Sequence, residues 1–338
     1  EDVALETWFN DYIFPMESNL TPEHVYWGAL LGIAEMIEAG ITNVADHYFY
    51  MDQVAEAIQC SGIRGNLAHA VFEHEGIEKL NETGDFVKRW QGKADGRIKT
   101  WLGPHSPYLC GPEFLRESAR LAESLDVGIH LHVSETIDQV HQSQEKYGMT
   151  PVRMLLETGI LDRPTILAHC SYPTEEDLKI IAEHQAGVGQ APKTYLRMGM
   201  GIGPMQQYQS HGIPVGFASD GAASNSTLDL YEQMRLAALT QKFIQNDATA
   251  LPLGEVLKIG FLGGAQACQE PNLGTLEPGK LADIVLLRQD RAASHPRLNI
   301  ASNLVYTLNA GDVDTVICNG QVLMQHRNLL TINKTEII

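Results

Sequence analysis

The chain alternates short apolar runs rich in β-branched residues with longer stretches whose apolar residues recur at helical spacing. We predict strands at 41–47, 63–71, 98–105, 127–133, 165–169, 187–191 and 214–220. Helices are predicted over 21–38, 173–183 and 228–243, and a further helix begins at Gly111-Pro112. Strands that alternate with helices of this length favour parallel pairing through right-handed crossovers.

This order predicts the α/β class, and within it a (β/α)8 TIM barrel that lacks its first strand in this chain. A closed barrel of this type needs eight strands, whereas the pattern supplies seven runs and opens in a loop and helix. We therefore expect one strand to precede residue 1.

The pattern changes near residue 270. A turn-rich stretch at 273–280 is followed by short apolar runs at 282–287, 313–318 and 321–324, with a turn at Asn319-Gly320. We expect a metal-dependent hydrolase barrel over residues 1–269 and a small C-terminal β-sandwich segment over residues 270–338.

Composition and charge limit the classes of molecule that the protein is expected to bind. The 338 residues carry a formal net charge of −18, which disfavours binding to nucleic acid. No apolar run approaches the roughly 18 residues of a membrane span, so we expect no membrane contact. The five cysteines form no CxxC pair and predict neither a disulfide framework nor a thiolate zinc site, as in a reducing cytoplasm. A small-molecule substrate fits these properties.

Candidate chemistry lies where the predicted strands end, because barrel enzymes draw catalytic groups from the carboxyl ends of several strands. Six such ends carry an ionisable residue: His47, His69, His105, His132, His169 and Asp220. In His130-Leu131-His132, both imidazoles share a strand face. Glu135 follows, and a carboxylate there can act as a general base beside a metal ligand. The spacing to Glu135 favours His132 as the ligand.

Each residue also has a plainer interpretation. The two histidines of the triplet fit a hydrogen-bonded core pair, His169 fits a satisfied core residue, and Asp220 before a glycine fits a turn. On that interpretation, each of these residues would need its own structural reason to lie at the same end of the barrel. We therefore favour a catalytic site.

Longer strings carry a family resemblance. They are Gly103-Pro104-His105-Ser106-Pro107-Tyr108, residues 219–225 with 232–237, and residues 274–283. Together with the His-x-x-Glu, His and Asp-Gly positions, they resemble the amidohydrolase superfamily. Within it, the chain is most similar to the S-adenosylhomocysteine/5′-methylthioadenosine deaminase branch and its triazine-hydrolase relatives, from about residue 1 to about residue 325.

The resemblance implies one divalent metal, zinc or alternatively iron, held in part by His132 and Asp220. Asp220 would also take a proton from the attacking water, Glu135 would carry it to a ring nitrogen, and His169 would polarise the reacting centre. His105 and Ser224 would contact the substrate. The implied reaction is attack of metal-bound hydroxide on the amino-bearing carbon of a purine-, pterin- or triazine-like ring, an adenosine derivative included, with release of ammonia.

Three departures qualify the resemblance. The family's first-strand His-x-His pair is absent from the chain and is expected shortly before residue 1. His69 stands where relatives that accept the homocysteine carboxylate place an arginine, and Tyr195 stands where an asparagine is usual. We expect both to line the substrate pocket, and His69 to weaken binding of S-adenosylhomocysteine.

Two other interpretations stay open. One keeps the fold but removes chloride or an alkylamine from a triazine-like ring, and the other is a non-catalytic, incomplete member of the fold. Relatives of this kind are commonly oligomeric, so the resemblance is also compatible with a homo-oligomer.

Overall fold

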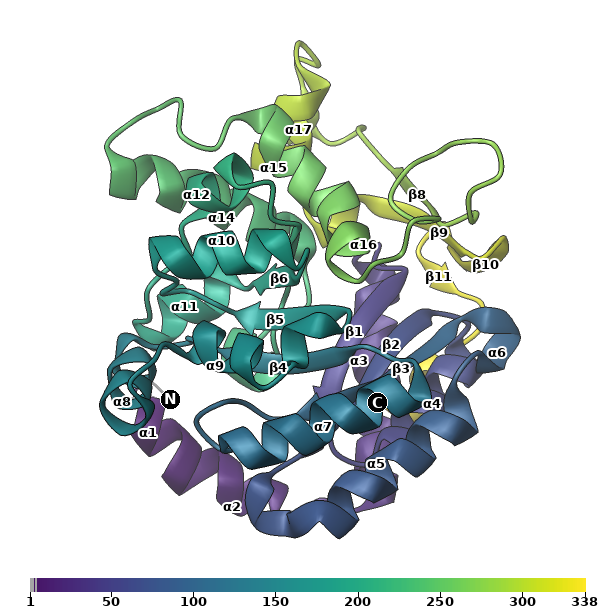
Figure 1. The fold of residues 1–338 in the computed structure, drawn as a ribbon. Coiled ribbons are helices and arrows are strands. Elements are labelled where there is room, and N and C mark those ends of the chain that lie inside the picture. Colours follow the sequence, from purple (N-terminus) through teal and green to yellow (C-terminus); the bar gives the residue numbers. More distant parts are fainter. Residues whose placement is uncertain (1–2, 4) are drawn as a thin grey trace.

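A parallel sheet forms the centre of the molecule. The computed structural model describes residue 3 and residues 5–338; the predicted barrel segment also includes residues 1, 2 and 4, which lie outside the described residues. The strands are β1 (Asn43–Tyr48), β2 (Arg64–Val71), β3 (Ile98–Pro104), β4 (Ile129–Val133), β5 (Thr165–His169), β6 (Gly187–Gln190) and β7 (Val215–Phe217). They pair in sequence order, so all seven predicted strands are confirmed (Figure 1).

The sheet is curved but does not close within the described residues, where β1 pairs with β2 alone and β7 with β6 alone. The predicted fold class, a TIM-type barrel that lacks one strand, is thereby confirmed. Because every strand runs in the same direction, all seven carboxyl ends lie at one edge of the sheet, where barrel enzymes place their chemistry.

Helices cover the outer side of the sheet between consecutive strands, and others precede β1 or follow β7 (Figure 1). They are α1 (Leu5–Thr7), α2 (Phe14–Glu17), α3 (Pro22–Glu38), α4 (Met51–Ser61), α5 (Gly76–Trp90), α6 (Lys93–Gly96), α7 (Pro112–Leu125), α8 (Ile137–Tyr147), α9 (Pro151–Glu157), α10 (Glu175–Glu183), α11 (Pro192–Met198), α12 (Met205–Ser210), α13 (Ala222–Asn225), α14 (Leu230–Gln245), α15 (Leu253–Lys258), α16 (Gly264–Ala267), α17 (Ile300–Tyr306) and α18 (Lys334–Ile337). Two π-helical segments, η1 (Trp8–Ile13) and η4 (Ile259–Gly263), and four 3-10 turns complete the list: η2 (Glu73–Glu75), η3 (Ile160–Asp162), η5 (Ala292–Ser294) and η6 (Ala310–Asp312).

The helix starts follow local capping chemistry. The Thr21 hydroxyl accepts a hydrogen bond from the His24 amide at 3.2 Å, and proline occupies the first turn of α3. Thr174 caps α10 in the same way through the Asp177 amide. The predicted starts at Thr21 and Gly111 are confirmed to the residue, since both are the N-caps of their helices.

The core lies between the sheet and these helices. Leu67 of β2 and Phe86 of α5 are fully buried, and burial of such side chains contributes about 1.5–3 kcal/mol each. On the far side, α16 packs directly on backbone: a Cβ at Gly187 of β6 would lie 2.3 Å from the Ala267 oxygen. Glycine at this strand position therefore allows the helix to lie directly against the strand backbone.

A second, antiparallel sheet follows, in the order β11-β10-β9-β8. Its strands are β8 (Ile284–Leu287), β9 (Val313–Cys318), β10 (Gln321–Gln325) and β11 (Asn328–Leu329), of which the first three were predicted. It packs on the end of α3, where a Cβ at Gly40 would meet Val285 and Val313 at 3.0 and 3.2 Å. The boundary at residue 270 between a barrel and a sandwich segment stays a prediction.

An ion pair joins this sheet to the barrel. Arg64 at the start of β2 lies 3.1 Å from Asp283, and both side chains are less than a tenth exposed.

Within the described part of the chain, no helix is long and apolar enough to span a bilayer.

Candidate active site

Four imidazoles meet at the carboxyl end of the parallel sheet. His105 follows β3, and its ring lies 4.6 Å from that of His132 on β4, centroid to centroid and nearly parallel. The His132 ring lies 5.4 Å from that of His169, which ends β5. His47 of β1 lies 5.1 Å from His132. The structure thus brings three predicted site residues together and adds His47, which the strand-end pattern includes but to which no role was assigned.

The alternation of β4 sets the depth of its two histidines. Period-two spacing places both on one face of the strand, which the packed sheet turns inward, and His130 lies one layer deeper, 5.4 Å from the His47 ring. The Nδ1 atom of His132 lies 3.2 Å from the backbone oxygen of His105. A carbonyl only accepts, so Nδ1 carries the proton and Nε2 keeps its lone pair. This arrangement is typical of an imidazole that binds a metal through Nε2.

Burial favours the neutral form of His132, His105 and His130. It lowers the pKa of His132, and the nearby His169 lowers it further, against the opposing effect of Glu135 and Asp220. Burial, followed by the neighbouring imidazoles, also lowers the pKa of His105 well below its usual value and that of His130 to about 3. Neutral imidazoles retain the lone pairs that metal binding and hydrogen-bond acceptance require.

Glycine makes room for His47 in this cluster. A Cβ at Gly103 of β3 would lie 2.7 Å from the His47 ring, and the Gly103 oxygen is 3.0 Å from His47 Nε2. The neighbouring His105 ring is held through Nδ1, 3.0 Å from the Ser106 hydroxyl, and by stacking on Phe72 with centroids 4.8 Å apart.

Glu135 lies just past β4 and is only 6% exposed. Its Oε2 atom accepts hydrogen bonds from the Tyr108 hydroxyl at 3.2 Å and from Gln139 Nε2 at 3.4 Å. Its Oε1 atom lies 3.7 Å from His169 Nε2. Burial, and then the Glu135 charge, raise the pKa of Tyr108 well above its usual value, so Tyr108 stays a donor. One carboxylate oxygen is therefore held while the other faces His169.

Sequence reasoning assigned no role to Tyr108 or Gln139. Tyr108 is the last residue of the family-like string 103–108, and Gln139 follows Glu135 at the helical i+4 spacing. The sequence therefore contained information that could have identified both residues. The Gln139 side chain also accepts from the Glu135 amide at 3.0 Å, which ties the backbone and the carboxylate of Glu135 to the first turn of α8.

Asp220 lies three residues beyond β7, in the left-handed region at φ 58°. Its Oδ1 accepts from the Gly221 amide at 2.7 Å and its Oδ2 from the Ser224 hydroxyl at 2.8 Å. Ser224, expected to contact substrate, thus holds the Asp220 carboxylate. Among the described residues, no three His, Cys, Asp or Glu side chains converge into a complete metal site.

The two remaining predicted residues lie outside the imidazole cluster. His69 points to the helix side of β2, with its ring 5.9 Å from that of Phe86, because the inward position in this register belongs to Ala68 opposite His47. Tyr195 of α11 lies behind His169, with its hydroxyl 3.3 Å from Nδ1 and no exposed surface. The structure therefore does not bring His69 to the site, and it brings Tyr195 to His169.

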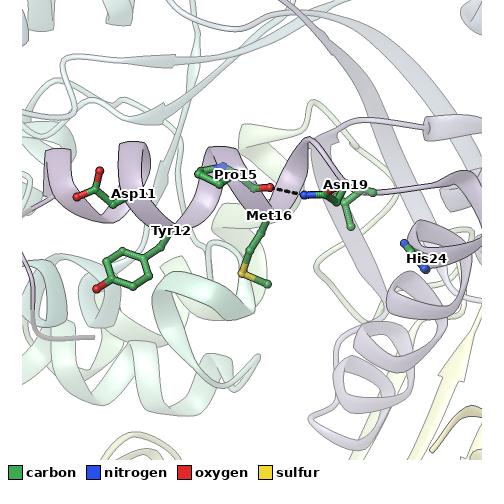
Figure 2. Close-up of a pocket in the computed structure, with 7 residues that line it drawn as sticks. Asp11, Tyr12, Pro15, Met16, Asn19 and His24 are labelled. Carbon is green, nitrogen blue, oxygen red and sulfur yellow. Dashed lines mark hydrogen bonds between the residues drawn. The ribbon is translucent and has the colours of Figure 1, made fainter.

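Two hollows lie elsewhere on the described part of the molecule. One of about 420 Å³ runs along η1, α2 and the start of α3, between Tyr12, Met16 and His24 (Figure 2). The other, of about 1220 Å³, is bordered by Gln185 and Gly212, which precede β6 and β7. Neither contains a residue of the imidazole cluster, and the second lies at the amino ends of the strands, the stabilising rather than the catalytic face of such barrels.

Known proteins match the chain over nearly its whole length. The model of the amidohydrolase family matches residues 2–323. A 5-methylthioadenosine/S-adenosylhomocysteine deaminase of Caldanaerobacter subterraneus subsp. tengcongensis is 42% identical over 99% of this chain and 79% of its own length. The enzyme of that name from Halothermothrix orenii is 42% identical over 100% of this chain and 79% of its own length.

Solved structures of similar proteins superpose on this chain. An adenosine deaminase from Xanthomonas campestris with bound zinc superposes with a TM-score of 0.93 at 30% identity, covering 100% of this chain and 78% of its own. An atrazine chlorohydrolase from Arthrobacter aurescens complexed with zinc gives 0.90 at 27% identity, covering 99% and 81%. The predicted hydrolase class and the resemblance to the deaminase branch are confirmed by these relatives. The chain belongs to the amidohydrolase family.

Proposed function

We propose that this protein is a metal-dependent hydrolytic deaminase of an adenosine derivative, such as the 5′-methylthioadenosine or S-adenosylhomocysteine for which its relatives are named. The observation that carries the proposal is the Glu135 carboxylate. It lies beside the imidazole cluster, with Oε2 held by two donors and Oε1 3.7 Å from His169 Nε2. A buried, oriented carboxylate of this kind suits general acid and base catalysis.

The donors present fit a divalent metal of the zinc type, with iron as the alternative. His132 offers an imidazole whose Nδ1 is fixed on a backbone carbonyl, and Asp220 offers a carboxylate oriented by Gly221 and Ser224. When bound, the metal would polarise water and lower its pKa towards neutrality. Zinc is bound in the adenosine deaminase and the chlorohydrolase that share this fold.

The residues divide the remaining work. Asp220 and Glu135 accept protons from the attacking water, and Glu135 Oε1 returns one to the ring nitrogen. His169 stabilises the tetrahedral centre, and His105, held by Ser106 and Phe72, contacts the substrate. Water adds to the amino-bearing carbon, the carbon–nitrogen bond breaks, and ammonia leaves with the transferred protons. The acid and base steps contribute roughly 10²- to 10⁴-fold each.

The proposal extends to the cellular compartment, the binding partners and the oligomeric state. All five cysteines are free, which supports a reducing cytoplasm. A small neutral or cationic substrate suits the net charge of −18, and nucleic acid does not. A homo-oligomer remains part of the proposal, to be tested by sedimentation.

Ammonia release and metal content test the function together. The full-length protein would be loaded with zinc or iron(II), analysed for metal, and assayed with adenosine, 5′-methylthioadenosine, S-adenosylhomocysteine, guanine, a pterin and an aminotriazine. We expect turnover of an adenosine derivative and about one tightly bound metal ion per chain. Chloride or alkylamine release from a triazine without any ammonia would instead identify the chlorohydrolase-like reaction. A protein that binds no metal and releases nothing would be the non-catalytic member of the fold.

A further inference from the structure

Tyr195 contacts the candidate site from behind. It lies on α11, just after β6, and no part of it is exposed. Its hydroxyl is 3.3 Å from Nδ1 of His169, and the two rings are 5.7 Å apart. A fully buried tyrosine cannot contact a substrate in this conformation, so its effect on chemistry must pass through His169.

The opposite edge of the His169 ring bears on where its proton lies. Nε2 is 3.7 Å from Glu135 Oε1, on a carboxylate whose second oxygen is already held by Tyr108 and Gln139. An ionised carboxylate accepts and cannot donate, and a neutral imidazole has one N–H. The favoured tautomer therefore carries its proton on Nε2, towards Glu135, and leaves a lone pair on Nδ1, towards Tyr195.

Tyr195 can supply the matching donor. Burial raises the pKa of its hydroxyl, so the proton is retained at neutral pH. The backbone of His169 is held as well, since its carbonyl oxygen accepts from the side chain of the buried Gln190. His169 itself lies in the left-handed region at φ 69°, an unusual conformation for a bulky residue, so contacts rather than local preference must set the ring.

We propose that Tyr195 is a positioning residue that holds His169 in the Nε2–H tautomer, with that N–H directed at Glu135 and the reacting centre. The catalytic consequence rests on the proposed function, whereas the tautomer does not. The sequence already made Tyr195 a candidate pocket residue, and the structure places its hydroxyl beside Nδ1 of His169.

The test removes one hydroxyl. Tyr195→Phe keeps the ring and its packing, and Tyr208→Phe is the matched control, because Tyr208 is equally buried and donates to the backbone oxygen of Cys170. Loss of an outer partner of a catalytic imidazole should lower kcat about 10- to 100-fold. KM should change less than roughly two-fold, and metal content should not change. Tyr208→Phe should lose comparable stability but keep its kcat.

A spectroscopic measurement reads the tautomer without turnover. In protein labelled with ¹⁵N-histidine, His169 would be assigned among the 13 histidines through a His169→Asn variant. We expect a protonated-type shift at Nε2 and a lone-pair-type shift at Nδ1 in the wild type, and averaged shifts in Tyr195→Phe. A wild-type His169 protonated at Nδ1 would overturn the proposal, even if the variant failed to fold.

Two further outcomes would also overturn it: a Tyr195→Phe protein with unchanged shifts and kcat, or an equal loss of kcat in Tyr208→Phe. If the shifts behave as expected while no aminated heterocycle is turned over, the proposed function fails and the positioning role stands.

Discussion

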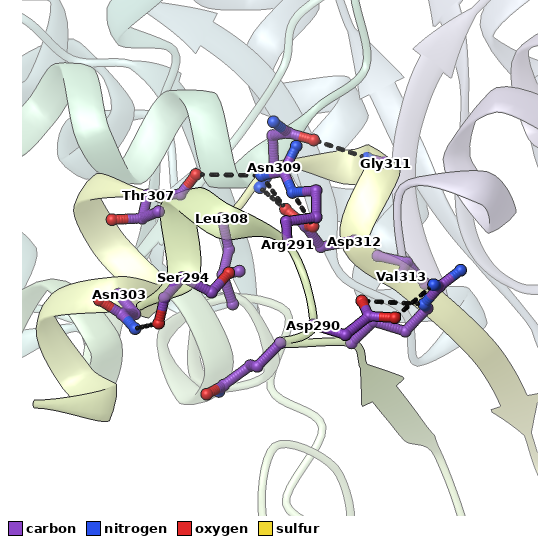
Figure 3. A network of polar contacts seen from close by, with 12 residues as sticks. Asp290, Arg291, Ser294, Asn303, Thr307, Leu308, Asn309, Gly311, Asp312 and Val313 are labelled. Atoms are coloured by element: carbon purple, nitrogen blue, oxygen red, sulfur yellow. Dashed lines mark hydrogen bonds and ion pairs between the residues drawn. The ribbon is translucent and has the colours of Figure 1, made fainter. Parts of the chain in front are cut away.

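Two of the places where buried polar side chains gather differ in character: the carboxyl end of the parallel sheet and the turn around Asp312 beside the C-terminal sheet. At Asp312, only 1% exposed, Oδ1 lies 2.6 Å from Arg291 Nε, and Oδ2 accepts from Arg291 and from the Asn309 amide (Figure 3). At the sheet end, neutral imidazoles crowd together instead. Within the described residues, unpartnered buried polar atoms occur at both places: Nδ1 of His130 and the hydroxyl of Ser134 at the sheet end, and the hydroxyl of Ser294 near Asp312.

The backbone differs in the same way. Ser134, His169 and Asp220 at the rim all lie in the left-handed region, with φ of 46°, 69° and 58°. Each such conformation costs on the order of 1–3 kcal/mol and persists only where the surroundings enforce it. The turn at Asp312 pairs its buried charge with a cation, whereas the rim combines crowded imidazoles with left-handed backbone at three residues.

The largest expected effect is on catalysis at the rim. Glu135→Gln keeps the shape of the side chain but removes its basicity, and should lower kcat about 10²- to 10⁴-fold in an ammonia-release assay. Metal content and melting temperature should stay close to those of the wild type. Glu117→Gln on α7, where the side chain is 44% exposed, is the control with no expected effect. If Glu135→Gln kept full activity, Glu135 would not be the general acid and base.

The opposite pattern is expected at the Asp312 turn. Arg291→Met leaves a buried carboxylate without its cation, and because Arg291 itself is 43% exposed, the free energy of unfolding should fall by about 1–3 kcal/mol, with little change in kcat. The control is Arg288→Met, whose pair with Asp290 is more than half exposed on both sides and should contribute at most about 1 kcal/mol. Urea unfolding of both variants measures the difference. Equal losses would show that burial does not distinguish the two pairs.

His69 sharpens the comparison, because it is an imidazole buried away from the rim. Burial, and then the charge of Lys79, lower its pKa from 6.5 to about 4. The unfolded chain binds its proton first as pH falls, so stability is complete above pH 6.5 and is lost towards pH 4. The loss is at most about 3 kcal/mol, at roughly 1.4 kcal/mol per pH unit.

Urea unfolding at several pH values between 7.5 and 4 would measure this contribution as a difference from a His69→Leu variant. The variant should lose less stability on acidification than the wild type, although the rim histidines still titrate in both. Parallel curves would contradict the assignment.

The smallest expected effect is at the outer partner of Glu135. Tyr108→Phe removes one of two donors to Oε2 and leaves Gln139 in place, so kcat should fall about 10-fold, the lower end of the range for such partners. Steady-state kinetics would measure this fall, with Gln139→Leu as the companion variant. A loss as large as that of Glu135→Gln would mean that Tyr108 itself takes part in the chemistry.

The sequence predicted the strands well because periodicity and flanking polar residues are local properties. All seven parallel strands and the caps at Thr21 and Gly111 lie where the pattern placed them. β11 was not predicted, since two residues carry no period. Chain position also singled out His132, Glu135, His169 and Asp220, because all of them follow apolar runs that end at the same edge of the sheet.

Tertiary structure decided the directions of side chains and the contacts between distant segments. The register of β1 on β2 turns His47 inward and His69 outward, although both close apolar runs. Tyr195 meets His169 across 26 positions of the chain, a contact that no local pattern encodes. Periodicity determines which residues can share a face, but only the packed sheet determines which face is the inner one and which hydrogen-bond partners are within reach.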